Sequence, residues 1–185
     1  MEAVDNIIAN IRYRKVLKFI KENKIQLENK KVVDLGGGNG YFKKLLIKQG
    51  AKVTTVDIAN ADVKADLNKR LPFEDKEFDI AFSLAVVEHL YNPYLFLEEM
   101  KRISYIQIGT TPHKRSKRIL DFLASINVIN KEHIKDHKIY LTEKELNKVG
   151  YNTETFEFGM NILFYRKLSQ VIKRLHVLYV DMKRI

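Results

Sequence analysis

Short apolar runs alternate with amphipathic segments along this chain, and the alternation predicts an α/β fold. Residues 5–23 carry isoleucine, valine and leucine near helical spacing, which predicts a leading helix. The runs KVVDL (31–35) and AKVTTVDI (51–58) have the β-branched character of buried strands. Between them lie a glycine cluster and a helical segment, YFKKLLIKQG, that ends in glycine. A strand, a glycine loop, a helix and a second strand form the opening of a doubly wound sheet.

The second half of the chain continues this alternation. Its expected strands are FDIAFSLA (78–85), ISYIQIGTT (103–111), TETFEF (153–158) and HVLYVDMK (176–183). Its expected helices cover residues 93–103, 114–126 and 142–150, with a basic helix within 161–174. Asn92 is expected to cap the helix that begins at Pro93, and Thr142 with Glu145 should form a capping box.

Length and linker content predict one domain. A chain of 185 residues can bury one proper core, and no Pro/Gly/Ser-rich linker or repeat interrupts the order of elements. We therefore expect a single domain over residues 1–185, with a leading helix in 1–25 and a lid on the substrate side at 111–142.

Composition narrows the chemistry. The absence of cysteine excludes disulfides, thiolate metal sites and cysteine nucleophiles. No apolar run reaches the roughly 18 residues that a membrane span needs, and the N-terminus lacks a secretory leader, so we expect a cytoplasmic protein with no integral membrane segment. The net charge of +10 suits an anionic partner, although a Lys-, Ile- and Asn-rich composition accounts for it equally well.

The stretch VVDLGGGNG holds the most informative glycines. Gly36, Gly38 and Gly40 are not followed by Lys-Ser/Thr, so the loop is not a P-loop. Tyr41 is too bulky for the third small position of a dinucleotide fingerprint. Asp34, just before the loop, would repel a pyrophosphate but can accept hydrogen bonds from an ammonium group. The loop therefore favours a cationic nucleoside without phosphate.

A second acid supports this interpretation. Asp57 lies at the tip of the second strand, 21 residues after Gly36, where a carboxylate can accept hydrogen bonds from both ribose hydroxyls. A structural turn alone would explain the glycines but neither Asp34 nor Asp57. The loop and the two acids together predict a nucleoside site at the carboxyl edge of the sheet.

Over roughly residues 30–110, these motifs resemble the class I S-adenosylmethionine-dependent methyltransferases. VVDLGGGNG is similar to the first motif of that family, VTTVDI to the second, and ADLNKRLPFEDKEFDIAFSLAVVEHL to the segment through the third and fourth. The resemblance implies a Rossmann-like, doubly wound seven-stranded sheet in three α/β/α layers. The last strand of that sheet is antiparallel, and HVLYVDMK would supply it. The implied cofactor is S-adenosyl-L-methionine.

The resemblance also assigns roles to individual positions. Asp57 matches the ribose-binding acid, Asp66 the acid that reaches the adenine amino group, and Leu67 a residue whose backbone lies beside the ring. Ser83 ends the fourth strand near the methionine part of the cofactor. The expected cofactor-binding residues are Asp34, Gly36, Gly38, Gly40, Asp57, Ile58, Asp66, Leu67 and Ser83.

Methyl transfer from a sulfonium depends mainly on positioning and on exclusion of water. A hydroxyl or amine acceptor still benefits from a base, for which histidine is suited. Four histidines can stand at the carboxyl edge: His89, His113, His133 and His137. We take His89 and His137 as the catalytic candidates.

Glu88 and His89 also resemble part of a metal site. Ubiquinone-pathway O-methyltransferases and enzymes that methylate the terminal 2′-hydroxyl of small RNAs carry Glu-x-x-Glu-His here, and a later histidine, matched by His137 in DHKIYLTEKEL, completes the site. This chain has Ala85 in place of the first glutamate. Because a lost ligand weakens a metal site, the sequence favours His89 as a simple base over a metal site of Glu88, His89 and His137. A plain helix start with an exposed acid is a further alternative for Glu88 and His89.

Several acceptors fit the sequence. TTPHKRSKR and EHIKDHKIYLT resemble the lid of methyltransferases that act on quinones, lipids and sugar chains, so a hydroxyl (or amine) of a small molecule, lipid or glycan is the first expectation. The basic excess keeps an RNA ribose 2′-hydroxyl as the alternative. A third hypothesis is a non-catalytic subunit that binds S-adenosylmethionine and activates a partner. The sequence makes no prediction of oligomeric state.

Overall fold

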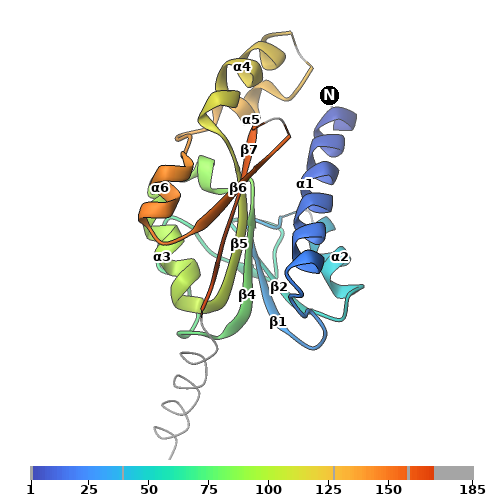
Figure 1. Ribbon diagram of the computed structural model, residues 1–185, viewed down its shortest axis with the longest axis vertical. Helices are drawn as coiled ribbons and strands as arrows, with labels where there is room; N and C mark the ends of the chain where they lie inside the picture. Colours follow the sequence, from blue (N-terminus) through green and yellow to red (C-terminus); the bar gives the residue numbers. More distant parts are fainter. Residues whose placement is uncertain (1, 39, 127, 158, 169–185) are drawn as a thin grey trace, which may run out of the picture.

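The computed structural model describes residues 2–38, 40–126, 128–157 and 159–168. Within them, one seven-stranded sheet has the order β3-β2-β1-β4-β5-β7-β6 (Figure 1). Strand β7 is antiparallel to β5 and β6, and the other neighbouring strands are parallel. Helices cover both faces, so the doubly wound three-layer α/β/α fold predicted from the sequence is confirmed.

The bounds of the elements follow. The strands are β1 (Lys31–Leu35), β2 (Lys52–Asp57), β3 (Val63–Lys64), β4 (Phe78–Leu84), β5 (Ser104–Pro112), β6 (Asn152–Phe156) and β7 (Asn161–Lys167). The helices are α1 (Glu2–Glu22), α2 (Tyr41–Ile47), α3 (Pro93–Ile103), α4 (Lys117–Ser125), α5 (Lys131–Lys135) and α6 (Glu143–Lys148). Two single-turn 3₁₀ helices are η1 (Val87–His89) and η2 (Lys114–Ser116).

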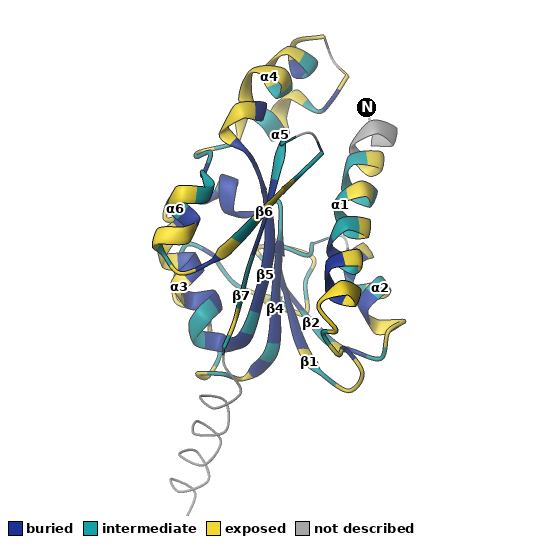
Figure 2. Cartoon of the chain, viewed as in Figure 1, coloured by how far each residue is buried: buried dark blue, intermediate teal, exposed yellow. Residues whose placement is uncertain are grey.

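Two apolar cores lie on opposite faces of the sheet. On one face, Phe19 of α1 and Leu46 of α2 pack against the central strands. On the other face, Phe96 of α3 and Leu146 of α6 do the same. Figure 2 shows the central strands dark blue along most of their length, with exposed residues on the outer sides of the helices. Burial on both faces explains why these strands read as continuous apolar runs.

Both predicted helix caps are present. The Asn92 side chain accepts a hydrogen bond of 3.1 Å from the Leu95 amide at the start of α3. At the start of α6, Thr142 accepts from the Glu145 amide, while the Glu145 carboxylate accepts from the Thr142 amide at 2.8 Å. These caps satisfy amide groups that have no partner inside a helix.

The prediction of a basic helix within 161–174 is wrong where the structure describes it. Residues 161–167 form β7, which pairs with β5 on one side and β6 on the other. Phe164 packs into one core and Leu163 into the other, so the apolar run is a strand buried on both faces. The antiparallel strand of the sheet is thus β7. HVLYVDMK, predicted to supply that strand, lies outside the described residues.

The segment between β5 and α6 is the one for which the sequence predicted a lid, and it is called the lid below. It consists of η2, α4 and α5, and Figure 1 shows it beyond the ends at which β4 and β5 finish. The helix predicted over 114–126 is divided between η2 and α4. Among the described residues, no helix is both long and apolar enough to cross a membrane.

Candidate active site

The glycine loop lies against the ends of β1 and β2. Gly36 has a φ of 81°, which favours glycine, and its amide donates to the Val56 carbonyl at 2.7 Å. A Cβ on Gly36 would fall 2.3 Å from a methyl group of Val86, and one on Gly38 would fall 2.8 Å from Oδ2 of Asp57. The loop therefore fits between the end of β2 and the segment after β4 only without side chains.

Asp34 is a buried carboxylate at the base of this loop. It is 2% exposed, and its Oδ2 atom has no hydrogen-bond partner among the described residues. Burial, followed by the nearby charge of Asp57, raises the pKa of Asp34 to about 7. A carboxylate that is buried without a partner fits a cationic ligand, as the sequence predicted.

The second acid lies next to the loop and begins a connected segment. Oδ1 of Asp57 accepts from the Ile58 amide at 2.7 Å, and the Ile58 side chain is 77% exposed. The Asp57 carbonyl accepts from the Ala65 amide at 3.0 Å, which brings the segment after β3 to the end of β2. Asp66 and Leu67 follow in that segment. Because β2 and β3 pair in parallel with Asp57 opposite Lys64, the acid predicted to bind the ribose lies at the same sheet edge as the segment predicted to bind the adenine.

Two further predicted cofactor residues lie on either side. Ser83, near the end of β4, is fully buried, and its Oγ atom has no hydrogen-bond partner among the described residues. Gly40 precedes α2 with a φ of 64°, and a Cβ there would meet nothing within 4 Å. Its positive φ requires the freedom of glycine, although the space around it does not.

Three ligand-type side chains meet at the end of β4. Atoms of Glu88, His89 and His137 that could bind a metal all lie within 4.8 Å of one another. Glu88 is 1% exposed, which contradicts its interpretation as an exposed acid. Burial raises the pKa of Glu88. Its Oε2 accepts from Thr111 Oγ1 at 3.1 Å, whereas Oε1 has no partner among the described residues.

Other side chains orient the two histidines. Nδ1 of His89 lies 3.1 Å from Oδ2 of Asp136, and Nδ1 of His137 lies 2.8 Å from the Tyr140 hydroxyl. The two imidazole rings meet edge to face, with centroids 4.8 Å apart. Burial, followed by the charge of His89, lowers the pKa of His137 to about 4, so that His137 is neutral at physiological pH. Partners of this kind fix the orientation of metal-binding histidines.

The backbone holds this cluster beside the glycine loop. The Glu88 carbonyl accepts from the Lys138 amide at 2.7 Å, which fixes the lid segment to η1. Val86, whose methyl group limits the space at Gly36, lies two residues before Glu88. Ala85 has a φ of 58°, and its amide donates to the Thr110 carbonyl at 2.9 Å. A non-glycine residue at positive φ is uncommon and often marks a functional site.

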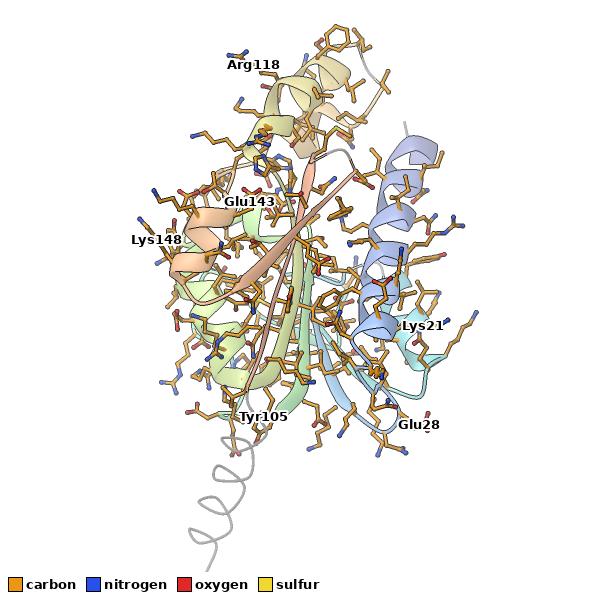
Figure 3. The ribbon with its side chains drawn as sticks, viewed as in Figure 1. Lys21, Glu28, Tyr105, Arg118, Glu143 and Lys148 are labelled. Carbon is orange, nitrogen blue, oxygen red and sulfur yellow. The ribbon has the colours of Figure 1, made fainter. Side chains whose placement is uncertain are left out.

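His113 has a structural role. Its Nε2 lies 2.8 Å from Oε2 of Glu143, and its Nδ1 accepts from the Arg115 amide at 2.8 Å. Both ring nitrogens are therefore occupied, and the pair joins the start of the lid to α6. Figure 3 shows Glu143 at the base of the lid and Arg118 on its outer side. His133 belongs to α5.

Sequence reasoning missed three residues of the cluster. Thr111, Asp136 and Tyr140 contact Glu88, His89 and His137, respectively. The only signals available were the position of Thr111 at the end of a strand and the closeness of Asp136 and Tyr140 to His137 in the sequence. The partnership across 47 residues between Asp136 and His89 required the folded structure.

Comparisons with known proteins agree with this geometry. Residues 33–104 match the methyltransferase domain family. The chain is 29% identical over 116 residues to tRNA U34 carboxymethyltransferase of Nautilia profundicola, an alignment that covers 53% of this chain and 39% of that protein. It is 30% identical over 125 residues to the mitochondrial ubiquinone biosynthesis O-methyltransferase of Arabidopsis thaliana, covering 58% of this chain and 38% of that protein. These alignments thus span about two fifths of the length of either relative.

A solved structure supports the same fold. Magnesium protoporphyrin IX methyltransferase from Synechocystis PCC 6803, determined with bound S-adenosylhomocysteine (SAH), superposes with a TM-score of 0.60 at 15% identity. The superposition covers 85% of this chain and 82% of that one. The described residues thus share the fold of this methyltransferase structure, and residues 33–104 match the methyltransferase domain family.

Proposed function

We propose that this chain transfers a methyl group from S-adenosylmethionine to a hydroxyl group of a small molecule, a lipid or a glycan. The observation that carries the proposal is the position of Glu88, His89 and His137 beside the glycine loop. Methyl transfer to a hydroxyl needs a site that holds the cofactor and a base that accepts the hydroxyl proton, and here both lie at the same edge of the sheet.

The chain's own residues would bind and orient the cofactor. Asp34 supplies the buried carboxylate for the ammonium group of the methionine part, and Asp57 accepts hydrogen bonds from the ribose hydroxyls. Ile58 and the backbone of Leu67 would lie beside the adenine, and Asp66 would accept a hydrogen bond from its amino group. Gly36, Gly38 and Gly40 leave room for the methionine and ribose, and Ser83 lies near the methionine part.

His89 is the proposed base. An Nδ1 proton donated to Asp136 leaves the lone pair on Nε2, where it can accept a proton from the acceptor hydroxyl. His137 is neutral because of burial, so it adds no positive charge that would oppose this proton transfer. Asp136 is a positioning residue, since it acts through His89.

The same cluster fits a divalent metal. The unpartnered Oε1 of Glu88 and two imidazoles held by Asp136 and Tyr140 form a ligand set with outer partners already in place. As the alternative to His89 as the base, we propose that Glu88, His89 and His137 hold the ion, with the Nε2 lone pair of His89 bound to it. Such an ion would lower the pKa of a bound hydroxyl.

RNA is the second candidate acceptor. The match to a tRNA-modifying relative and the net charge of +10 favour it. Phosphate contacts release counterions, so binding to RNA should weaken steeply as salt rises. Affinity for tRNA or short RNA that stays flat between 50 and 200 mM salt would exclude this candidate.

The test begins with calorimetry. Wild-type protein should bind S-adenosylmethionine, and Asp57→Ala should bind it at least tenfold more weakly; undiminished binding in the variant would contradict the cofactor site. Transfer of tritiated methyl groups into cell extract, with and without a chelator, then identifies the acceptor class and the metal requirement. Cofactor binding with no transfer to any fraction would favour the non-catalytic subunit.

A further inference from the structure

A cavity inside the lid adjoins the proposed catalytic cluster. It has a volume of about 300 Å³ and lies between α4 and α5. Its lining comprises Lys117, Asp121, Ala124, Ser125, Lys131, Ile134, Lys135, His137 and Tyr140. That volume is at the lower end of the range for small-molecule sites and suits a group about the size of one phosphorylated sugar.

The charges around the cavity are mostly positive. Lys117, Lys131 and Lys135 line it, and among the described residues of the lining Asp121 is the one acid. Asp121 lies 2.8 Å from Lys117 and so neutralises that lysine. The other two lysines, four positions apart on α5, remain as surplus positive charge.

The positive charges of Lys131 and Lys135 are barely neutralised by acidic side chains of the described residues. Lys131 has no ion-pair partner within the described part of the chain. Lys135 lies 3.6 Å from Glu132, but the side chains are 61% and 81% exposed, so the pair is weak. A dianionic ligand would gain charge-assisted hydrogen bonds from both lysines.

His137 connects the cavity to the cluster. Its ring lines the cavity and meets the ring of His89 edge to face at 4.8 Å. Tyr140 also lines the cavity and bonds Nδ1 of His137. A molecule held here is therefore separated from Glu88 and His89 by no more than one side chain.

Arg12 adds positive charge on the other side of the cluster. Burial is the main cause of the altered pKa values of both Glu88 and His137, but the charge of Arg12 contributes to each. In Figure 1 the first turns of α1 rise toward the level of the lid, and Arg12 lies near the middle of this helix. An anionic acceptor would thus meet cations from both α1 and α5.

We propose that the lid cavity binds an anionic group, a phosphate or a carboxylate, of a small acceptor whose hydroxyl lies at the Glu88–His89–His137 cluster. Lys131 and Lys135 bind the anion and so select the acceptor. This inference rests on the proposed methyl transfer for the role of the hydroxyl, whereas anion binding in the cavity can be measured without turnover.

The first experiment measures binding alone. Calorimetry with inorganic phosphate and with malonate should detect a saturable site in the wild-type protein. Lys131→Gln/Lys135→Gln should weaken it at least fivefold. The matched control is Lys44→Gln/Lys48→Gln, which removes the same charge from two exposed lysines that are also four positions apart. Lys44 lies in α2 and Lys48 directly follows it. This variant should bind both anions as the wild-type protein does. No saturable binding, or equal loss in both double variants, would overturn the proposal. The stronger of the two probes tells phosphate from carboxylate.

The second experiment measures selection. Methyl transfer is compared between hydroxy compounds that differ only in one phosphate or carboxylate. The charged member should have at least a tenfold higher kcat/KM, and Lys131→Gln/Lys135→Gln should remove this preference through KM, with cofactor affinity unchanged. Equal turnover of charged and neutral members would refute the acceptor assignment. Anion binding without any methyl transfer would instead count against the proposed function and leave the anion site standing.

Discussion

Oδ2 of Asp136 lies 3.1 Å from Nδ1 of His89, which joins the lid to the turn after β4. The hydrogen bond selects one tautomer of His89 and holds the ring in place. Asp136 also lies 2.6 Å from Lys138, and that hydrogen bond is the main cause of its lowered pKa. Asp136 therefore remains ionised throughout the neutral pH range and can hold His89 there.

Asp136→Asn should lower kcat tenfold or more, because the neutral amide no longer fixes the His89 tautomer. The KM for S-adenosylmethionine should stay unchanged, and Asp136→Glu should restore part of the rate. The control is Lys138→Gln, which removes the other partner of Asp136 but leaves the carboxylate on His89. Steady-state kinetics checks the prediction, and similar losses in both variants would show that the effect comes from lid stability.

Asp34 should make cofactor binding depend on pH. Its pKa of about 7 in the free protein means that it is ionised above pH 7 and protonated below. An ammonium group binds the ionised form, so affinity for S-adenosylmethionine should be constant above pH 7 and fall by up to about tenfold per unit below it. Calorimetry between pH 5.5 and 8.5 measures this. Asp34→Asn should bind weakly at every pH, and a pH profile equal to that of wild type would count against the assignment.

The same residue should reduce the stability of the unliganded protein. Since the folded-state pKa is raised from 3.8 to about 7, ionisation costs stability as pH rises through that interval, roughly 4 kcal/mol at most. Asp34→Asn should therefore have a higher Tm than wild type at pH 8 without ligand, and the difference should shrink toward pH 4. Thermal unfolding at both pH values tests this, and a lower Tm of the variant at pH 8 would contradict it.

Ala85 stands where the resembling metal enzymes carry a glutamate. Ala85→Glu should strengthen binding of Mn²⁺ or Mg²⁺ about tenfold or more, because it adds a carboxylate to a three-residue ligand set. Ala85→Gln is the matched control, since its side chain has nearly the same size and the same positive φ but no charge. Calorimetry with each ion makes the comparison. Equal affinities of the two variants would argue against a metal at this cluster.

A buried ion pair should anchor the segment that follows Leu67. The Glu99 carboxylate accepts from Nε of Arg102 at 2.7 Å and from the Leu71 amide at 2.8 Å. Burial alone would raise the pKa of Glu99, but these hydrogen bonds outweigh it and lower the pKa. Its contribution to stability should therefore be present at neutral pH and decrease as pH falls toward the ordinary pKa of a glutamate and below it.

Glu99→Gln should reduce the free energy of unfolding by about 2 kcal/mol at pH 7, because it weakens the charge-assisted hydrogen bonds to Arg102 and to the Leu71 amide. Arg102 keeps its ion pair with Asp75, which limits the loss. The adjacent Glu98→Gln is the control. Glu98 is 62% exposed and, among the described residues, forms an ion pair with Lys101 alone, so its loss should cost under about 1 kcal/mol. Urea unfolding at pH 7 and pH 3.5 tests both variants, and the two should converge at the lower pH. A cost for Glu99→Gln that is independent of pH would indicate a packing effect.

The positions of the residues proposed to bind the cofactor could be predicted from the sequence because they depend on local order. β1 covers residues 31–35, as expected, and parallel pairing of β1 with β2 places Asp34 near Asp57. The carboxyl ends of parallel strands share one edge, so position along the chain translates directly into position in space. The need for glycine at position 36 could be predicted for the same reason, because the turn directly after β1 requires a positive φ.

The rest of the candidate site depends on contacts between segments far apart in the sequence. The sequence allowed Glu88 to be an exposed acid at a helix start. In the structure it is buried, and its carboxylate accepts a hydrogen bond from the Thr111 hydroxyl. His113 resembled a candidate base until its two partners were seen. β7 was missed because an apolar run with nearby basic residues suits either a helix or a buried strand, and only its two neighbouring strands decide between them.

The hydrogen bond between His113 and Glu143 closes the lid into a loop whose two ends meet. The proposed cofactor residues all precede this loop in the sequence, and within the loop Leu141 belongs to a core of the sheet. Substitutions at exposed positions of α4 and α5 should therefore change which acceptor enters without disturbing the sheet or the nucleoside cradle. Evolution, or an engineer, could vary these two helices and retarget the enzyme while Asp34, Asp57 and His137 stay in place.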